Sequence, residues 1–273
     1  MHIYTIFTKC SKITFMYLIT GASLIIFLLV ACTGNPSPKN QSAAFQVSRP
    51  FANVFSSLGE IPLPDGFSRT SVDAASFAWW LRKLPLKSDN TVYLYNGAPK
   101  PNQQAQFAVL DVSVGDRDLQ QCADAVMRLR AEYLYAQERF ESINFTDNEG
   151  GVYQFDEPYS RPRFDKYLQR VFGMCGTASL SKQMKQVYLR EMNVGDVFIK
   201  GGFPGHAVIV VDMAKNRMGK KIYLLAQSYM PAQDIHILNN PNDGALSPWY
   251  ELNDETSIIT PEYRFTSSQL KTW

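Results

Sequence analysis

The sequence predicts an α+β domain in which a helix carrying Cys122 packs on an antiparallel sheet. The longest helical pattern, Arg117–Phe140, has apolar residues at three- and four-residue spacing along one stripe. Two β-branched runs, Val197–Ile199 and Ala207–Val211, flank a Gly/Pro-rich loop, and the polar segment Lys215–Lys221 separates the second run from a third. Short apolar runs with such tight connections are typical of neighbouring strands.

The first segment, residues 1–31, has the features of a secretory signal peptide. Lys9 and Lys12 precede an apolar run from Ile13 to Val30. The Leu-Val-Ala-Cys sequence that ends at Cys32 resembles a bacterial lipobox, which implies cleavage before Cys32 and lipid attachment to it. We therefore expect a lipoprotein held on a membrane of the bacterial cell envelope, at its periplasmic or surface face. An apolar run of about 18 residues is also long enough for an uncleaved membrane anchor, and this alternative stays open.

Residues 32–45 comprise this cysteine and a flexible linker. The sequence Asn-Pro-Ser-Pro-Lys-Asn-Gln-Ser within it is polar and contains prolines, so it cannot bury a core. Residues 46–273 contain no second linker and no repeat. We therefore expect them to form a single α+β domain.

Charge and cysteine content exclude some classes of partner. The chain has 27 basic and 25 acidic residues, and two of the lysines lie in the signal peptide, which leaves 25 of each. There is no basic run, so we expect no nucleic-acid partner. Once Cys10 is removed with the signal peptide and Cys32 is lipidated, only Cys122 and Cys175 remain. They either form a disulfide in an oxidising compartment or leave a reactive thiol.

The remaining elements are expected from local patterns. Asp116 or Asp118 is a candidate cap for the long helix, and Ser71 for the first one. Pro231–Ile237 and Asn239–Asp243 have the composition of turns. In chain order we expect a helix at Ser71–Leu84, strands at Thr91–Tyr95 and Gln106–Val114, helices at Phe164–Phe172 and Ser179–Tyr188, a strand near Trp249-Tyr250, and a last strand or extended arm within Ile258–Trp273.

Cys122 lies on the apolar stripe of the long helix, near its beginning. A cysteine in this position is either a small buried hydrophobe or a thiol whose pKa is lowered by the helix dipole and a nearby imidazolium. His206 lies where a glycine-rich loop enters a strand, and Gly205 permits close approach of the backbone. An imidazole in this position is a candidate catalytic base for such a thiol.

The order of these motifs resembles that of the papain-like cysteine hydrolases. Gln-Cys-Ala-Asp-Ala-Val around Cys122, followed by Gly-Asp-Val-Phe-Ile and by Gly-His-Ala-Val-Ile-Val around His206, looks like the cysteine-histidine amidohydrolase/peptidase (CHAP) and NlpC/P60 groups. The resemblance implies a nucleophilic cysteine at a helix start, a histidine base on a strand and a polar orienting residue on the next strand. On a narrower scale, three motifs resemble a lipoprotein family described as domain of unknown function 4846, a resemblance that covers roughly Ile61 to Tyr250. They are Gly-Phe-Pro-Gly-His-Ala-Val-Ile-Val-Val-Asp, Ala-Gln-Ser-Tyr-Met-Pro-Ala-Gln and Ser-Pro-Trp-Tyr.

The orienting residue departs from the CHAP pattern, which places an acid or amide on the third strand. This chain offers Gln227, which can hydrogen bond to the imidazole, and Ser228, which lies on the opposite face of the strand. The sequence does not decide which face meets His206. Asp212 lies about six residues along the strand from His206, or about 20 Å, and is therefore a poor orienting group.

Other site chemistries are not supported, and we expect no cofactor and no bound metal. His206 and His236 lack partners at zinc-ligand spacing. We expect His236 to be a half-exposed strand residue. There is no Gly-x-Ser-x-Gly elbow and no phosphate-binding loop. Cys175 lies in the sequence Gly-Met-Cys-Gly-Thr, whose glycines indicate a loop. It is either a rival nucleophile or a structural cysteine.

Two functions follow from these patterns. The first is a cysteine peptidase or amidase that cleaves a peptide or peptidoglycan-like substrate of the envelope. Cys122 is then the nucleophile, His206 the base and Gln227 the orienting residue, in a cleft lined by aromatic residues of Tyr153–Phe164. The alternative is a non-catalytic envelope lipoprotein that uses the same fold to bind a peptide, a glycan or a partner protein.

Overall fold

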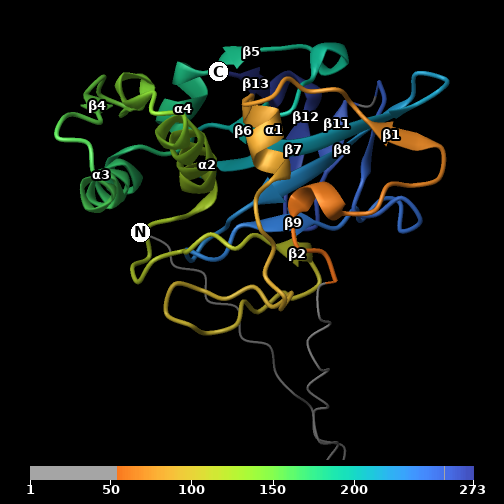
Figure 1. Ribbon diagram of the computed structural model, residues 1–273, viewed down its shortest axis with the longest axis horizontal. Helices are drawn as coiled ribbons and strands as arrows, with labels where there is room; N and C mark the ends of the chain where they lie inside the picture. The colour runs from red at the N-terminus through yellow and green to blue at the C-terminus, as the bar shows by residue number, and fades with distance from the viewer. Residues whose placement is uncertain (1–53, 255) are drawn as a thin grey trace, which may run out of the picture. The chain divides into compact units, whose positions relative to one another are not determined.

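Three apolar segments form the centre of an antiparallel sheet (Figure 1). They are β6 (Val197–Lys200), β7 (His206–Asn216) and β8 (Lys221–Gln227), and β7 pairs with both of its neighbours. The computed structural model describes residues 54–254 and 256–273. The predicted signal peptide, the predicted lipidation site Cys32 and the predicted linker to residue 45 lie outside these described residues.

The sheet extends on both sides of the central strands in the order β2-β9-β8-β7-β6-β13-β5, with β1 on β7 and β10 on β8. Every neighbouring pair in this sheet is antiparallel. Two separate hairpins, β3–β4 and β11–β12, are antiparallel as well. The outer strands and the hairpins have the bounds β1 (Phe67–Arg69), β2 (Gln106–Val109), β3 (Asn144–Thr146), β4 (Val152–Gln154), β5 (Lys185–Gln186), β9 (His236–Leu238), β10 (Tyr250–Leu252), β11 (Ser257–Ile259), β12 (Arg264–Thr266) and β13 (Leu270–Thr272).

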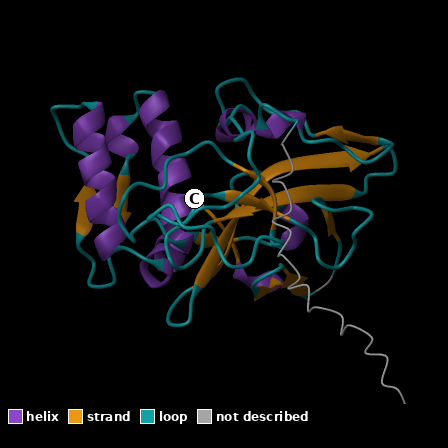
Figure 2. Ribbon diagram, turned by 90° about the horizontal axis from the view of Figure 1, so that it is seen from below, coloured by secondary structure: helices purple, strands orange, loops and turns teal. Residues whose placement is uncertain are grey.

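The helices are α1 (Phe77–Arg82), α2 (Cys122–Ala136), α3 (Arg161–Met174) and α4 (Thr177–Gln183). Short 3-10 turns lie at Leu58–Glu60, Phe140–Ser142, Leu189–Glu191 and Ser267–Gln269. Helices α2, α3 and α4 lie together at one side of the sheet, with the β3–β4 hairpin beside them (Figure 2). The predicted α+β class is therefore confirmed, including the antiparallel character of the sheet.

The two faces of β7 belong to two different apolar clusters. Ala207 and Ile209 pack in the cluster that contains residues of α2. Val208 and Val210 point the other way and pack with Phe265 of β12. This alternation follows from the two-residue period of a strand. By the same period, the side chain of His206 lies on the face of β7 that meets β12.

The main helix is shorter than the pattern predicted. It begins at Cys122, because the Asp124 carboxylate accepts a hydrogen bond from the Gln121 backbone N–H at 2.9 Å and so caps the helix from within. Asp118, one of the two predicted caps, instead accepts from the Ala232 backbone N–H at 2.7 Å. After the last helical turn, Glu138 has a φ of 54°, which a continuing helix does not allow.

Other boundaries also differ from the predictions. Helix α1 begins at Phe77 instead of Ser71, because Ala75 has a φ of 63° and Ser76 caps the helix. The predicted strand Thr91–Tyr95 is wrong: this segment makes only isolated bridges to Pro99 and Gln233. The segment Pro231–Ile237, predicted to be a turn, ends inside β9.

No helix in residues 54–254 and 256–273 is long and apolar enough to cross a membrane.

Candidate functional site

The predicted base and orienting residue are in direct contact. His206 is the first residue of β7, Gln227 is the last residue of β8, and His206 Nε2 lies 2.8 Å from Gln227 Oε1. Both side chains are buried, with 1% of their surface exposed. Ser228 is not the partner of His206, because its hydroxyl lies 2.9 Å from the backbone oxygens of both Gln120 and Gln233 and has its only proton to share between them.

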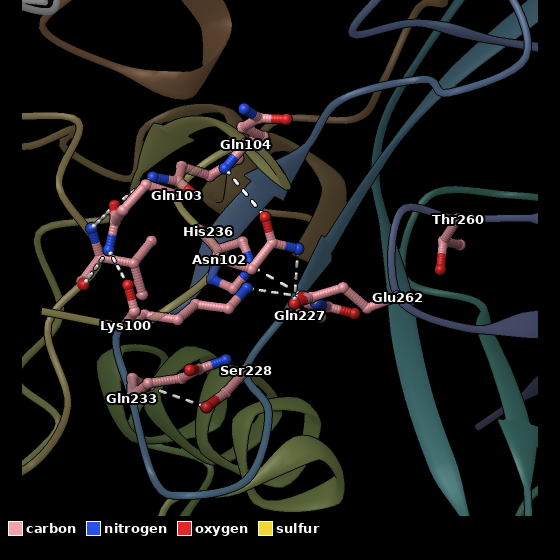
Figure 3. A network of polar contacts seen from close by, with 12 residues as sticks. Lys100, Asn102, Gln103, Gln104, Gln227, Ser228, Gln233, His236, Thr260 and Glu262 are labelled. Carbon is pink, nitrogen blue, oxygen red and sulfur yellow. Dashed lines mark hydrogen bonds and ion pairs between the residues drawn. The ribbon is translucent and has the colours of Figure 1, made fainter. Parts of the chain in front are cut away.

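Gln227 is held at its other end by two further groups. Its Nε2 donates to Glu262 Oε2 at 2.7 Å and lies 3.3 Å from His236 Nε2 (Figure 3). Nδ1 of His236 lies 2.9 Å from the backbone oxygen of Asp234. The predicted half-exposed position of His236 is wrong: it is fully buried, since β9 lies between β2 and β8.

This chain of contacts fixes the proton positions on both imidazoles. The Asp234 carbonyl can only accept, so His236 carries its proton on Nδ1 and accepts from Gln227 at Nε2. The Gln227 amide must then present its oxygen to His206. His206 therefore carries its proton on Nε2, and its Nδ1 has a free lone pair.

Both imidazoles are neutral around pH 7. Burial is the main cause, and it lowers the pKa of His206 to about 4 and that of His236 to about 3. For His206, the hydrogen bond with Gln227 and the charge of Glu262 oppose this shift, but only partly.

These shifts predict that the protein loses stability as the pH falls. The folded pKa of His206 lies below the unfolded value of 6.5, so the unfolded chain binds more protons between pH 6.5 and pH 4. The contribution of neutral His206 to the free energy of unfolding is fully present above pH 6.5 and declines towards pH 4. We expect His206 alone to account for a loss of about 1–2 kcal/mol between pH 7.5 and pH 5. Urea unfolding of wild type and His206→Gln at both pH values checks this, and equal losses in the two proteins would contradict it.

Cys122 is the first residue of α2, with 7% of its surface exposed. The backbone N–H of Ala207, the residue after His206, lies close enough to the thiol to lower its pKa, as do the N–H groups of Ala123 and Cys122 itself. Burial and the neighbouring Asp124 outweigh them and raise the thiol pKa to about 11. Around neutral pH the thiol therefore keeps its proton.

The thiol and the imidazole approach the same end of β7 from different sides. Within residues 54–254 and 256–273, no hydrogen bond joins Cys122 Sγ to the His206 ring, so the candidate nucleophile and the candidate base are not hydrogen-bonded to each other. Tyr229 packs edge-on against His206, with ring centroids 4.7 Å apart. Burial is the main cause that raises the pKa of the Tyr229 hydroxyl, and Glu262 and then Cys122 add to this shift.

The aromatic surroundings differ from the prediction. His206 packs against Tyr229, Tyr263 and Phe265, with ring centroids at 4.7, 4.9 and 5.8 Å. The aromatic residues of Tyr153–Phe164 pack instead with α2 and α3, for example Phe164 against Tyr135 at 4.5 Å. The predicted cleft lined by that segment is therefore wrong.

The other candidate residues have separate positions. Cys122 and Cys175 are both free thiols, and burial raises the pKa of Cys175 to about 12. Asp212 is fully buried and holds two arginines, Arg69 and Arg82, each at 2.7 Å. These two ion pairs connect β1 and α1 to β7, the strand that carries Asp212. Asp212 makes no hydrogen bond or ion pair with His206.

Gly205 is required where the β6–β7 loop enters β7. A Cβ atom there would overlap Thr177 Oγ1 and the Gly202 backbone oxygen, and would lie 2.8 Å from the Lys200 backbone oxygen. Two of these atoms belong to the backbone and cannot move without displacing the loop. We expect Gly205→Ala to cost about 1–3 kcal/mol of stability in urea unfolding. Gly219→Ala, at a hairpin tip with open space around it, is the comparison for ordinary glycine strain at a φ of 84°. A smaller loss for Gly205→Ala than for Gly219→Ala would contradict the steric argument.

His206, Gln227, His236, Glu262 and Lys100 form one polar cluster. Two of its residues, Glu262 and Lys100, were not predicted from the sequence. Glu262 lies in the turn between β11 and β12, and Lys100 lies in the loop before β2. Lys100 Nζ is 2.6 Å from Glu262 Oε2, and their side chains are 5% and 13% exposed. Neither residue has a local sequence pattern that distinguishes it from an ordinary surface charge.

Comparison with known proteins gives one match. The profile of a family described as domain of unknown function (4846) matches residues 59–159 and 152–272. No curated protein and no solved structure is significantly similar to the chain. The match confirms the predicted resemblance to domain of unknown function 4846.

Proposed function

We propose that this chain, which belongs to the family described as domain of unknown function (4846), is a papain-like cysteine hydrolase of the bacterial cell envelope. The observation that carries the proposal is the 2.8 Å contact between His206 Nε2 and Gln227 Oε1. It supports a base whose proton is held on Nε2 and whose Nδ1 is free to accept another. The start of α2, with the Cys122 thiol beside the Ala207 N–H, supports a nucleophile at the same end of β7.

The reaction follows from these protonation states. Because Cys122 is a thiol and His206 is neutral, the proton moves from Sγ to Nδ1 as the sulfur attacks the substrate carbonyl. The backbone N–H groups of Cys122 and Ala123 at the start of α2 stabilise the oxyanion. The imidazolium then gives the same proton to the leaving amine, and water hydrolyses the thioester. The step requires Sγ and Nδ1 to come within hydrogen-bond reach in the substrate complex, which is tighter than the site without substrate.

The substrate class is an amide or peptide bond of envelope material, such as a peptidoglycan-like peptide. The lipid on Cys32 would hold the domain on a membrane surface, at the periplasmic or outer face. The family description names no activity, so this assignment depends on the site alone.

A second candidate is a lipoprotein of the same fold that binds a peptide, glycan or partner protein without cleaving it. One observation favours it: burial raises the pKa of Cys122 to about 11 and lowers that of His206 to about 4. No thiolate–imidazolium pair therefore exists at neutral pH before substrate binds. In this case neither side chain is needed for function.

Incubation with peptidoglycan-derived peptides and a mixture of short peptides distinguishes the two candidates. We expect the full-length protein in detergent to release new amino termini, detected by mass spectrometry. Cys175→Ala, at the other buried free thiol, should retain this activity, whereas Cys122→Ala should lose it. Equal cleavage by both variants, or cleavage by none of the three proteins, would reject the hydrolase.

A further inference from the structure

Three side chains donate hydrogen bonds to the carboxylate of Glu262 (Figure 3). Gln227 Nε2 and Lys100 Nζ reach its Oε2 at 2.7 and 2.6 Å, and Asn102 Nδ2 reaches its Oε1 at 3.1 Å. Gln227 is the last residue of β8. Lys100 and Asn102 belong to a loop that precedes Glu262 by about 160 residues in the chain. The carboxylate thus joins this loop to the polar end of β8.

The amide of Gln227 has two orientations of nearly the same shape, and only one suits Glu262. In the observed orientation the amide nitrogen donates to the carboxylate and the oxygen faces His206. If the amide turned over, its oxygen would face a carboxylate that has no proton to donate. A charge-assisted hydrogen bond would be replaced by a repulsive contact. The 3.3 Å contact with His236 favours the same orientation but is longer and uncharged.

The orientation of this amide determines which nitrogen of His206 carries the proton. With the oxygen of Gln227 towards it, His206 Nε2 must donate, so Nδ1 is a free base. With the amide nitrogen towards it, Nε2 must accept and the proton moves to Nδ1. An Nδ1–H imidazole has no lone pair there and cannot take a proton from a thiol.

We propose that Glu262, held in place by Lys100, is a positioning residue that fixes the amide orientation of Gln227 and thereby keeps the proton of His206 on Nε2. The effect on the imidazole depends only on the contacts above. Its consequence for turnover rests on the proposed hydrolase. Lys100 contributes by holding the largely buried carboxylate, 2.6 Å away, in the position that Gln227 requires.

Glu262→Gln is the most direct test, because it keeps the size of the side chain and removes its preference for a donor. A glutamine can present either end of its amide to Gln227, so the charge-assisted preference is lost and only the longer, uncharged contact with His236 still favours the observed orientation. We expect the ratio of the Nδ1–H to the Nε2–H form of His206 to rise about tenfold or more. Nitrogen-15 NMR of the histidine-labelled full-length protein in detergent measures this ratio from the two imidazole nitrogens. If the hydrolase is correct, kcat should fall with the Nε2–H fraction while KM changes little.

Glu251→Gln is the matched control, since Glu251 makes an exposed ion pair with Lys220 at 2.7 Å and has no contact with the cluster. It should leave the tautomer of His206 unchanged. Lys100→Met, a second variant, should shift the ratio in the same direction as Glu262→Gln, but less. An unchanged ratio in both Glu262→Gln and Lys100→Met would overturn the positioning role. A shifted ratio in Glu262→Gln, together with no hydrolytic activity in the wild type, would support the positioning role and reject the hydrolase.

Discussion

His206→Ala is expected to lower kcat of the proposed hydrolysis by about 10 000-fold or more, as much as Cys122→Ala does. Without the imidazole, no group at the end of β7 accepts the proton of a thiol whose pKa is about 11. The sulfur then stays protonated and is a poor nucleophile. Steady-state kinetics on the best peptide found for the wild type measures the loss, and circular dichroism checks that the variants are folded.

The double variant Cys122→Ala/His206→Ala gives the decisive comparison. Because nucleophile and base act as a unit, the double variant should be no slower than either single variant. Effects that multiply would mean that the two residues act independently, which contradicts the proposed proton transfer. Cys122→Ala should cost only about 1 kcal/mol of stability, since it removes one small buried atom.

Asp212→Asn is expected to have the largest effect on stability, about 3–5 kcal/mol. The carboxylate is completely buried and neutralises the guanidinium groups of Arg69 and Arg82, whose side chains are 22% and 15% exposed. An asparagine keeps the shape but leaves both arginines without a counter-charge in a poorly hydrated position. Urea unfolding at neutral pH measures the loss.

Glu251→Gln serves as the reference for this variant too. The Lys220–Glu251 pair is about 40% exposed on both sides, so its removal should cost no more than about 1 kcal/mol. If Asp212→Asn loses as little stability as Glu251→Gln, the ion pairs of Asp212 with Arg69 and Arg82 do not hold α1 and β1 on the sheet.

The sequence was sufficient to predict that the central strands and the main helix exist. The fifteen residues of α2 give several repeats of the 3.6-residue period. Strand β7 was predicted from the continuous apolar run Ala207–Val211, five of its eleven residues, because the strand is buried on both faces and has no two-residue alternation. The boundaries were less predictable. Ser71 and Ser76 are equally good helix caps by composition, and the choice depends on the backbone of Ala75, which no side-chain pattern reveals.

Residues of the candidate site could be predicted from the sequence only where they lie on these long helices and strands. His206 begins β7 and Gln227 ends β8, so the antiparallel pairing of the two strands brings them together. Glu262 and Lys100 come from irregular segments 162 residues apart, and nothing local indicates that they meet. The burial of His236 was missed for a related reason: a three-residue strand has too few residues to show that sheet neighbours cover it on both edges.

Acylation by p-nitrophenyl acetate tests the central claim without knowledge of the natural substrate. An ester with a good leaving group needs only a nucleophile and a base, and it leaves an acetyl group on the attacking atom. We predict one acetyl group on Cys122 in the wild type and in Cys175→Ala, located by mass spectrometry of peptides at acidic pH. His206→Ala should remain unacetylated at this residue. Acetylation of Cys122 at the same rate in wild type and His206→Ala, or of Cys175 in its place, would contradict the assignment of Cys122 and His206 as nucleophile and base.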